Sequence, residues 1–480
     1  MEKVREIVRE GRRVAKEDPR RVVHSFKVGL VLALVSSFYY YQPLYDSFGV
    51  NAMWAVMTVV VVFEFSVGAT LGKGLNRVAA TLFAGGLGIG AHHLASMSGP
   101  TGEPILLAVF VFVQAALSTF VRFFPRVKAR YDYSLLIFIL TFALISVSGF
   151  REEQVVKLTH KRISTVIIGG LSCVIISIFV CPVWAGQDLH SLIASNFEKL
   201  SFFLLDFGDK YCEVVENDGA KEVDKRKKDF DNYKSVLNSK SNEESLANFA
   251  KWEPGHGQFR FRHPWKQYLA VGELIRQCAY RIHALNSYLN ADNKVSVDIK
   301  KKLGEPLRRM SLESGKAMKE MSISLKKMTK PSSPDLHVQN AKSACKSLTN
   351  LLNSGILKEV EPLELVSLLT AISLLIDIIN LTEKILESLH ELATAAKFKN
   401  KIEHPLFSEK PKAKSFVSVR SIKCHDDHVV IIIEDDGNND DTSKNDNGSK
   451  EVSIHEKHED DDTHVDARCV SCGHTSVCVK

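Results

Sequence analysis

At 480 residues the chain has room for two or three domains, and its apolar fraction of 45% is ordinary for a soluble protein. The formal net charge of +6 is too small to indicate nucleic-acid binding unless it gathers on one exposed face. The placement of the nine cysteines indicates no disulfide framework. Almost all long apolar runs precede Trp184, and the later chain is charged. We therefore expect the first half to lie in a membrane and the second half in water.

Residues 1–25 form a charged, basic segment that does not resemble a signal peptide. The apolar run that follows begins too deep in the chain for a cleaved leader and leads directly into a second run. We therefore predict a cytosolic N-terminal segment and a first apolar run that stays in the membrane.

The next part of the chain, 26–183, contains a series of apolar stretches, each close to the roughly 20 residues that cross a bilayer as a helix. Lipid offers the backbone no hydrogen-bond partner, and continuous apolarity without alternation favours helices over barrel strands. The six stretches lie at 26–42, 51–71, 78–97, 104–121, 133–149 and 163–183. The sequence predicts an all-α membrane protein with six transmembrane helices in a pore domain.

Lysine and arginine in the short links set the orientation, because cytoplasmic loops are enriched in them. The N-terminal segment, the second link and the fourth link are basic, whereas the first and third links contain neither residue. Both termini are therefore expected in the cytosol. A later run, Leu363 to Leu381, contains Glu364 and Asp377 and repeats apolar residues at helical spacing, so we predict a packed cytosolic helix and not a seventh span.

Charged side chains at the ends or interiors of membrane helices are costly, so each is a functional candidate. Here they are mostly basic, as an anion pathway requires: Lys27, Lys73, Arg77, Lys161 and Arg162. Arginine offers a planar fork that matches a carboxylate, so Arg77 and Arg162 are the predicted anion ligands and Lys73 an attractor. The alternative for the three lysines is that they anchor the helices at the membrane surface.

Glu64 is the one deep acidic residue, and we expect it to pair with one of these cations rather than to carry protons. Glycines recur in three groups: Gly68, Gly72 and Gly74; Gly85, Gly86, Gly88 and Gly90; and Gly169 and Gly170. The spacing of the first two groups does not match a nucleotide-binding loop. Close approach of membrane helices explains them better. Asp46, Glu152 and Glu153 fall in outward links and form a candidate site for an external multivalent cation, with an ordinary solvated loop as the alternative.

From residue 184 to 400 the sequence predicts successive helices with short breaks, and one helix places Val271, Ile275 and Cys278 on a packed seam. This region is expected to be a cytosolic helical bundle. From 401 to 480 the chain is acidic, rich in Asp, Asn, Ser and His, and predicted to be disordered. Cys469, Cys472 and His474 stand there at zinc-like spacing, which alone is a weak indication of a metal site.

Several long strings resemble the plant aluminium-activated malate transporter family. They include the run from Phe48 to Val59 with Trp54 at its centre, FEFSVGATLGKGLNR from Phe63 to Arg77, Trp252-Glu253-Pro254, and HGQFRFRHPWKQY from His256 to Tyr268. The resemblance covers roughly residues 1–400. It implies a homodimeric channel that carries malate and other anions through a basic pore, with Lys73, Arg77 and Arg162 among the pore positions. The candidate structural or gating residues are Trp54, Trp252, Glu253 and Pro254, together with Glu64.

Some members of that family respond to external aluminium, and Asp46, Glu152 and Glu153 are the carboxylates that the resemblance suggests for it. Phe202, Phe203 and Phe207 fall in a segment that resembles one proposed in the family for sensitivity to gamma-aminobutyrate, although core packing explains them better. Plasma-membrane members are more similar than vacuolar ones, so the plasma membrane is the expected location and the vacuolar membrane the alternative.

The sequence thus favours a passive anion channel with no cofactor and no enzymatic activity. A coupled, proton-linked organic-anion transporter is the alternative, and it would need intramembrane acids to carry protons, for which only Glu64 is deep enough. A membrane enzyme is disfavoured because no catalytic dyad or metal cluster stands at a predicted membrane face.

Overall fold

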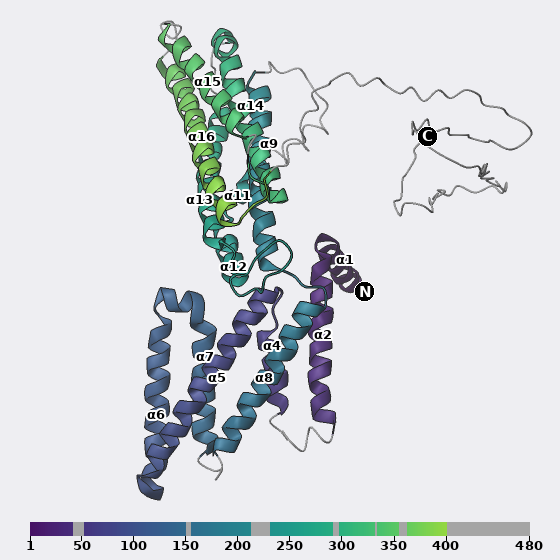
Figure 1. Ribbon diagram of the computed structural model, residues 1–480, viewed down its shortest axis with the longest axis vertical. Coiled ribbons are helices and arrows are strands. Elements are labelled where there is room, and N and C mark those ends of the chain that lie inside the picture. The colour runs from purple at the N-terminus through teal and green to yellow at the C-terminus, as the bar shows by residue number, and fades with distance from the viewer. Residues whose placement is uncertain are drawn as a thin grey trace, which may run out of the picture. The chain divides into compact units, whose positions relative to one another are not determined.

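The computed structural model describes residues 1–41, 52–149, 155–212, 231–290, 297–331, 334–354 and 362–400. The chain divides into two units, Met1–Ile402 and Glu403–Lys480, and the second unit lies outside the described residues. The predictions for the acidic tail and its cysteines therefore lie outside them as well. Every named element in the described residues is a helix (Figure 1), which confirms the all-α class.

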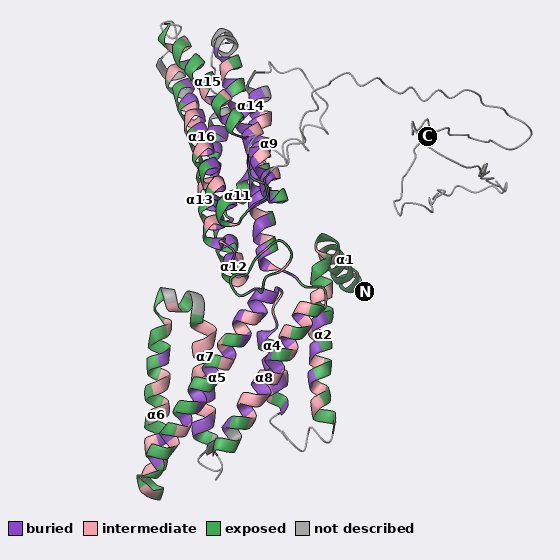
Figure 2. Ribbon diagram, viewed as in Figure 1, coloured by how far each residue is buried: buried purple, intermediate pink, exposed green. Residues whose placement is uncertain are grey.

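The first half consists of helices with long exposed apolar faces (Figure 2). They are α1 (Glu2–Glu17), α2 (Pro19–Tyr40), α4 (Met53–Val62), α5 (Val67–Ser96), α6 (Gly99–Arg122), α7 (Pro125–Gly149) and α8 (Val155–Phe179). Four of them contain segments long and apolar enough to cross a membrane, namely Pro19–Tyr40, Val67–Ser96, Gly99–Arg122 and Thr159–Phe179. Met53–Val62 and Tyr131–Val147 are shorter apolar helices. The chain is a membrane protein.

The second predicted helix, 51–71, is wrong in its bounds. The described helix α4 ends at Val62, and α5 begins at Val67 and runs without a break through the predicted second link. Ser66 caps α5 by accepting a hydrogen bond from the Ala69 amide at 3.3 Å. Lys73 and Arg77 therefore lie inside a helix, not around a turn, because the break comes several residues earlier than their charge suggested.

The last helix of this half also differs from the prediction. Helix α8 begins at Val155, eight residues before the predicted start. Arg162 therefore lies two turns inside the helix and not at its N-terminal end. Similarly, α2 begins at Pro19, with Asp18 as its cap, and Lys27 lies two turns inside it. In both places the sequence predicts a helix start near the charged residue, whereas the helix begins before it.

Some of the recurring glycines allow helices of the first half to approach closely, as the sequence predicts. A Cβ at Gly88 would lie 2.8 Å from Ile145 of α7, and one at Gly169 would lie 2.7 Å from the Ala55 carbonyl oxygen of α4. Gly68 and Gly72 have another role, because a Cβ there would meet Phe249 and Trp252 of the second half. The prediction of membrane-helix packing is wrong for those two.

The second half is a bundle of helices that bury one continuous apolar core (Figures 1 and 2). Its elements are α9 (Ala185–Cys212), η2 (Asp231–Tyr233), α11 (Lys234–Leu237), α12 (Lys240–Ala250), α13 (Trp265–Asn290), α14 (Val297–Lys327), α15 (Pro334–Asn353) and α16 (Pro362–Ala395). The predicted seam residues Val271, Ile275 and Cys278 of α13 are fully buried in this core.

Helix α16 contains the apolar run Leu363 to Leu381, which the sequence predicts to be a packed helix and not a seventh span. It is not among the candidate spans, Leu368 and Ile372 are buried in the bundle core, and Asp377 pairs with Arg281 of α13 at 3.1 Å. Phe203 and Phe207 of α9 are buried, in agreement with core packing, whereas Phe202 is 44% exposed, so that prediction is wrong for Phe202.

Candidate functional site

Arg77 is buried in the membrane half, only 5% exposed, about ten residues or 15 Å from the start of α5. Its Nη1 donates a hydrogen bond to the Tyr133 hydroxyl of α7 at 2.9 Å, and its Nε is buried without a partner. Among the described residues no carboxylate pairs with this guanidinium. Most buried donors find an acceptor, so an unused one calls for an explanation.

Arg162 of α8 is in a comparable position. It is 7% exposed, and its Nε is also buried without a partner. The guanidinium carbon lies 4.2 Å from the centre of the Trp54 ring of α4. A cation over an indole face is attracted by the ring quadrupole, by about 2 kcal/mol where water is excluded. The Trp54 ring thus compensates part of the charge of Arg162, while the Nε donor of Arg162 has no hydrogen-bond partner.

One small cavity brings these side chains together. It is lined by residues of α4, α5, α7 and α8, namely Trp54, Arg77, Thr81, Ile137, Leu140, Thr141, Leu144, Arg162 and Val166. Its volume of about 20 Å³ leaves room for about one water molecule. Two guanidinium groups at one cavity in an apolar half of the molecule attract an anion strongly, because a charge buried without a counterion is costly.

Lys73 stands one helical turn before Arg77 and has a different environment. It forms an ion pair with Glu64, so the expected pairing of Glu64 with a cation is found, and both side chains are about one-third exposed. Its Nζ lies 5.9 Å from the centre of the Tyr133 ring. Glu64 lies in the break between α4 and α5, where its amide donates a hydrogen bond to the Thr70 hydroxyl oxygen at 3.1 Å. Tyr133 therefore contacts both basic residues of α5.

The other two predicted lysines do not line this cavity. Lys27 is 2% exposed, and its Nζ donates to the carbonyl oxygen of Cys181 at 2.7 Å, beyond the end of α8. Lys161 precedes Arg162 and is half-buried. The structure therefore brings together Arg77 and Arg162, the two residues whose geometry suits a carboxylate, and leaves Lys27, Lys73 and Lys161 outside.

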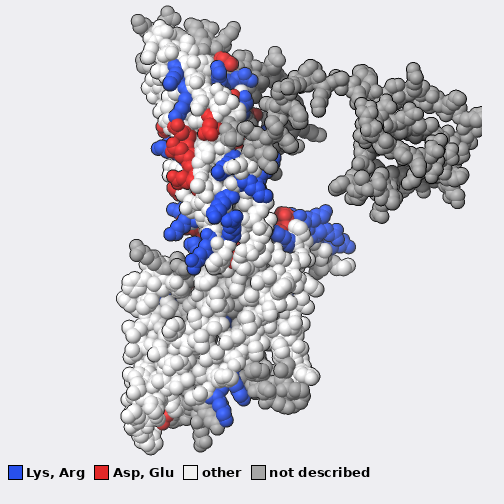
Figure 3. Space-filling view, in the orientation of Figure 1, with Lys and Arg blue, Asp and Glu red and all other residues white. Residues whose placement is uncertain are grey.

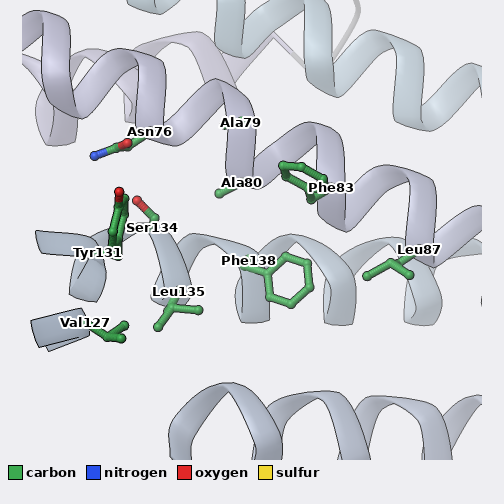
Figure 4. Close-up of a pocket in the computed structure, with 10 residues that line it drawn as sticks. All are labelled: Asn76, Ala79, Ala80, Phe83, Leu87, Val127, Tyr131, Ser134, Leu135 and Phe138. Carbon is green, nitrogen blue, oxygen red and sulfur yellow. The ribbon is translucent and has the colours of Figure 1, made fainter. Parts of the chain in front are cut away.

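A larger cavity of about 460 Å³ lies between α5 and α7 (Figure 4). Its polar groups are those of Asn76, Tyr131 and Ser134, and apolar side chains such as Phe83 and Phe138 make up the rest. No charged side chain lines it. The lining of this cavity suits an apolar ligand and does not suit a dianion.

The Trp252-Glu253-Pro254 motif lies between α12 and α13 and joins the two halves. Glu253 is 4% exposed and accepts hydrogen bonds from the amides of Ala185 at 2.6 Å and Gly186 at 3.0 Å, at the start of α9. A carboxylate there satisfies free amides and meets the positive end of the helix dipole. Burial raises the pKa of the Glu253 carboxyl, and these amide hydrogen bonds oppose the rise.

The same motif contacts the start of α5, the helix that carries Lys73 and Arg77. Trp252 lies against Gly72, where a Cβ would meet its ring at 2.9 Å. The amide of Val67 donates to the carbonyl oxygen of Val183 at 2.9 Å. The Pro254 carbonyl oxygen lies 3.0 Å from Nδ1 of His256, whose ring stacks on Trp184 at 3.8 Å. We call this contact region, made by residues 249–256 with the starts of α5 and α9, the junction.

Two histidines lie beside the junction and share a hydroxyl. Nδ1 of His190 lies 2.9 Å from the Tyr268 hydroxyl oxygen, and Nε2 of His263 lies 3.3 Å from it. Burial lowers the pKa of each imidazole to about 4. Both rings are therefore neutral at neutral pH.

The predicted site for an external cation falls outside the described residues, since Asp46, Glu152 and Glu153 all lie there. Within the described part of the chain there is no cluster of three or more metal-ligating side chains. Sequence reasoning missed Tyr133, the hydrogen-bond partner of Arg77. The only signal for it was a phenol at the start of an apolar stretch.

Comparison with known proteins defines the class. The sequence profile of the family described as "Aluminium activated malate transporter" matches residues 12–358. The chain therefore belongs to the aluminium-activated malate transporter family. It is 94% identical to aluminum-activated malate transporter 7 of Arabidopsis thaliana, with 100% of each chain covered. It is 69% identical to aluminum-activated malate transporter 2 of the same plant, over 99% of this chain and 98% of the relative.

A more distant relative extends the likeness to a grass. Aluminum-activated malate transporter 1 of Triticum aestivum is 44% identical over 80% of this chain and 84% of its own length. The match to the family profile covers residues 12–358, so helices α2 to α8 and the junction lie inside the shared region.

Proposed function

We propose that this chain forms a passive channel that releases malate and other anions from the cytosol across a plant plasma membrane, with the vacuolar membrane as the alternative location. The relatives' names suggest malate as the transported ion. Arg77 and Arg162, which line one cavity, provide groups that can bind an anion. Malate is a dianion with two carboxylates, each of which matches the fork of a guanidinium.

The observation that carries the proposal is the cavity with two buried, partly unsatisfied guanidinium groups. A transient anion there would satisfy both Nε donors. No carboxylate among the described residues competes for either arginine. The Trp54 ring holds the guanidinium group of Arg162 in place, and the Tyr133 hydroxyl holds that of Arg77. Moderate stabilisation suits conduction, since an ion must also leave.

The proposal includes six transmembrane helices, with α4 and α7 added to the four candidate spans, both termini in the cytosol, and assembly as a homodimer. The basic N-terminal segment supports this orientation. Efflux follows from the driving force: a dianion leaving an inside-negative cell gains about 4.6 kcal/mol per 100 mV, twice the value for one charge.

Voltage-clamp recording with malate or chloride inside tests the channel directly. We expect Arg77→Ala and Arg162→Ala each to reduce outward anion flux by tenfold or more at equal surface expression, because each removes a charge-assisted site worth about 1.5–3 kcal/mol. Arg122→Ala is the matched control, since Arg122 pairs with Asp132 at 2.8 Å and does not line the cavity. Unchanged conductance and selectivity in both cavity variants would rule the proposal out.

The alternative is a proton-coupled transporter that uses Glu64. Its ion pair with Lys73 disfavours this, because the carboxylate already has a counterion in the protein. Transport through a coupled carrier would be limited by turnover and would shift with the proton gradient. A reversal potential for malate that moves with pH at fixed malate would therefore support the alternative over the channel.

Activation by external aluminium is the part of the proposal that rests on the relatives' names together with the acidic outward links. We propose Asp46, Glu152 and Glu153 as the ligands, because hard trivalent cations bind carboxylate oxygens. External aluminium should raise the current in the parent chain, and replacing the three by Asn, Gln and Gln should abolish the increase while leaving the basal current. An increase that persists in the triple variant would place the aluminium site elsewhere.

A further inference from the structure

Helix α1, at the N-terminus, has three distinct stripes along its length. Its apolar side chains recur at helical spacing on one face, at Val4, Ile7, Val8 and Val14. Next to them runs a basic stripe, which consists of Arg5, Arg9, Arg12 and Lys16. The remaining stripe is acidic and is partly neutralised by Arg13, which pairs with Glu10 at 2.6 Å and lies 3.7 Å from Glu17.

The apolar stripe is exposed in the structure. Val4 is 63% exposed, Ile7 70% and Val8 56%. An amphipathic helix with this pattern is expected to bury its apolar face, and α1 presents it to the surroundings. Among the described residues, no ion pair involves Arg5, Arg9, Arg12 or Lys16, so the basic stripe is open as well.

The position of α1 in the chain restricts where this face can lie. Only Asp18, in an extended conformation with φ −146° and ψ 97°, separates α1 from the spanning helix α2. Figure 1 shows α1 turned off the axis of α2, at the end of α2 nearest the bundle. The outward apolar face of α2 begins at Val22, which is 54% exposed, and continues at Phe26, which is 66% exposed.

These facts fix the depth of α1. Helix α2 begins at Pro19, three residues or about 5 Å along the helix before Val22, and the headgroup region on each side of the hydrocarbon is about 5–8 Å thick. The C-terminal end of α1 therefore lies at the membrane surface. The space-filling view agrees, since basic side chains gather at the α1 end of the otherwise weakly charged membrane half (Figure 3).

We propose that α1 lies in the plane of the membrane surface, with Val4, Ile7, Val8 and Val14 in the acyl boundary and with Arg5, Arg9, Arg12 and Lys16 on the headgroups of anionic phospholipids. An interfacial helix of this kind combines apolar burial with attraction to anionic lipid, of about 1 kcal/mol per basic residue near the surface. The α1 surface is a lipid-binding surface separate from the anion cavity, and it does not depend on which ion the protein conducts.

The α1 surface is also connected to the junction. Arg20, two residues after Asp18, donates to Asp188 of α9 at 2.8 Å and to Asp18 at 3.1 Å. A change in the position of α1 on the membrane therefore acts on the start of the bundle through one short chain of contacts.

Tryptophan fluorescence in reconstituted full-length protein tests the proposal. Ile7→Trp and Arg9→Trp place a probe on opposite sides of α1, since two residues are about 200° apart around a helix. Both sites are exposed, so neither change disturbs packing. Subtracting the signal of the parent chain, with its four tryptophans, isolates the added probe. The membrane is made with lipids brominated on the acyl chain, which quench nearby tryptophan.

In vesicles that contain phosphatidylserine, we expect the added fluorescence of Ile7→Trp to be quenched several-fold more strongly than that of Arg9→Trp. Aqueous iodide should show the reverse order. Replacing Arg5, Arg12 and Lys16 by Gln in the Ile7→Trp chain, or omitting phosphatidylserine, should reduce the bromolipid quenching several-fold. Equal quenching at the two positions would overturn the proposal. Shielding of position 7 from both quenchers would overturn it in favour of contact with a second copy, and indifference to anionic lipid would overturn the headgroup assignment.

Discussion

At the scale of single residues, the two arginines of the cavity differ in what holds them. Arg77 is fixed by a hydrogen bond to Tyr133, whereas Arg162 lies over the ring of Trp54. Each support contacts one part of the guanidinium and leaves the Nε donor free. Removing a support should therefore misplace a charge without deleting it.

We predict that Tyr133→Phe weakens apparent malate affinity by about threefold to tenfold, because a neutral hydrogen bond contributes about 0.5–1.5 kcal/mol. The maximal current should change much less, since Arg77 keeps its charge. Current measured against internal malate concentration checks this. Tyr131→Phe, on the side of the other cavity, is the control and should leave the affinity unchanged.

Trp54→Leu should affect Arg162 in a similar way. The loss of a desolvated cation–π contact of about 2 kcal/mol leaves the guanidinium less well positioned. Trp54→Phe keeps a weaker aromatic face and should retain part of the function. The order of apparent malate affinity should therefore be Trp, then Phe, then Leu at position 54. An equal loss for Phe and Leu would show that the side chain acts by size and not through its ring face.

At the scale of elements, the break between α4 and α5 is the part that the sequence did not reveal. The run 51–71 reads as one helix, because neither proline nor glycine stands between Phe63 and Ser66 and Glu64 is the one charged residue there. The break depends on hydrogen bonds that composition does not reveal. The Glu64 amide donates to the Thr70 hydroxyl oxygen, and the Val67 amide donates to the Val183 carbonyl oxygen. Periodicity did predict the seam of α13, since its burial is set along one face of one helix.

The candidate site was predicted to a similar extent. Position in the apolar part of the chain and residue type together selected Arg77 and Arg162, because arginine suits a carboxylate, and both side chains line one cavity. The separate environments of Lys27 and Lys73 could not be predicted, since they depend on the Cys181 carbonyl group and on the path of the chain at Glu64. The Trp252-Glu253-Pro254 string indicated importance by resemblance only, and its contacts with α5 and α9 appear only in three dimensions.

We predict that Glu253→Gln destabilises the junction by about 1–3 kcal/mol, because one amide oxygen replaces two carboxylate oxygens that each accept an amide hydrogen bond. Thermal unfolding of the detergent-purified protein measures the loss. Glu244→Gln is the control, since Glu244 is exposed one position after buried Glu243, and it should stay within about 0.5 kcal/mol. Equal unfolding temperatures for the two variants would show that Glu253 does not stabilise the start of α9.

At the scale of the whole molecule, the histidines near the junction predict how stability depends on pH. Their folded pKa of about 4 lies below the unfolded value of about 6.5. As the pH falls below about 6.5, the unfolded chain takes up protons that the folded chain excludes, so stability decreases until about pH 4. Each histidine accounts for at most about 3 kcal/mol of this loss.

The fall in unfolding temperature between neutral pH and pH about 5 should therefore be smaller in His263→Gln than in the parent chain, although the variant is less stable at neutral pH. His256→Gln is a suitable comparison, because His256 stacks on Trp184 near the same place. An identical pH dependence in His263→Gln and the parent would show that the ring titrates equally in both states.

The central claim is that Arg77 and Arg162 make one anion-selective pathway, and the reversal potential under a salt gradient tests it most directly. With potassium malate at unequal concentrations on the two sides, the parent channel should reverse near the malate equilibrium potential. The Arg77→Gln/Arg162→Gln double variant should shift toward zero, because the charge that excludes cations is gone. A double variant that still reverses at the parent's potential, with normal surface expression, would contradict the claim.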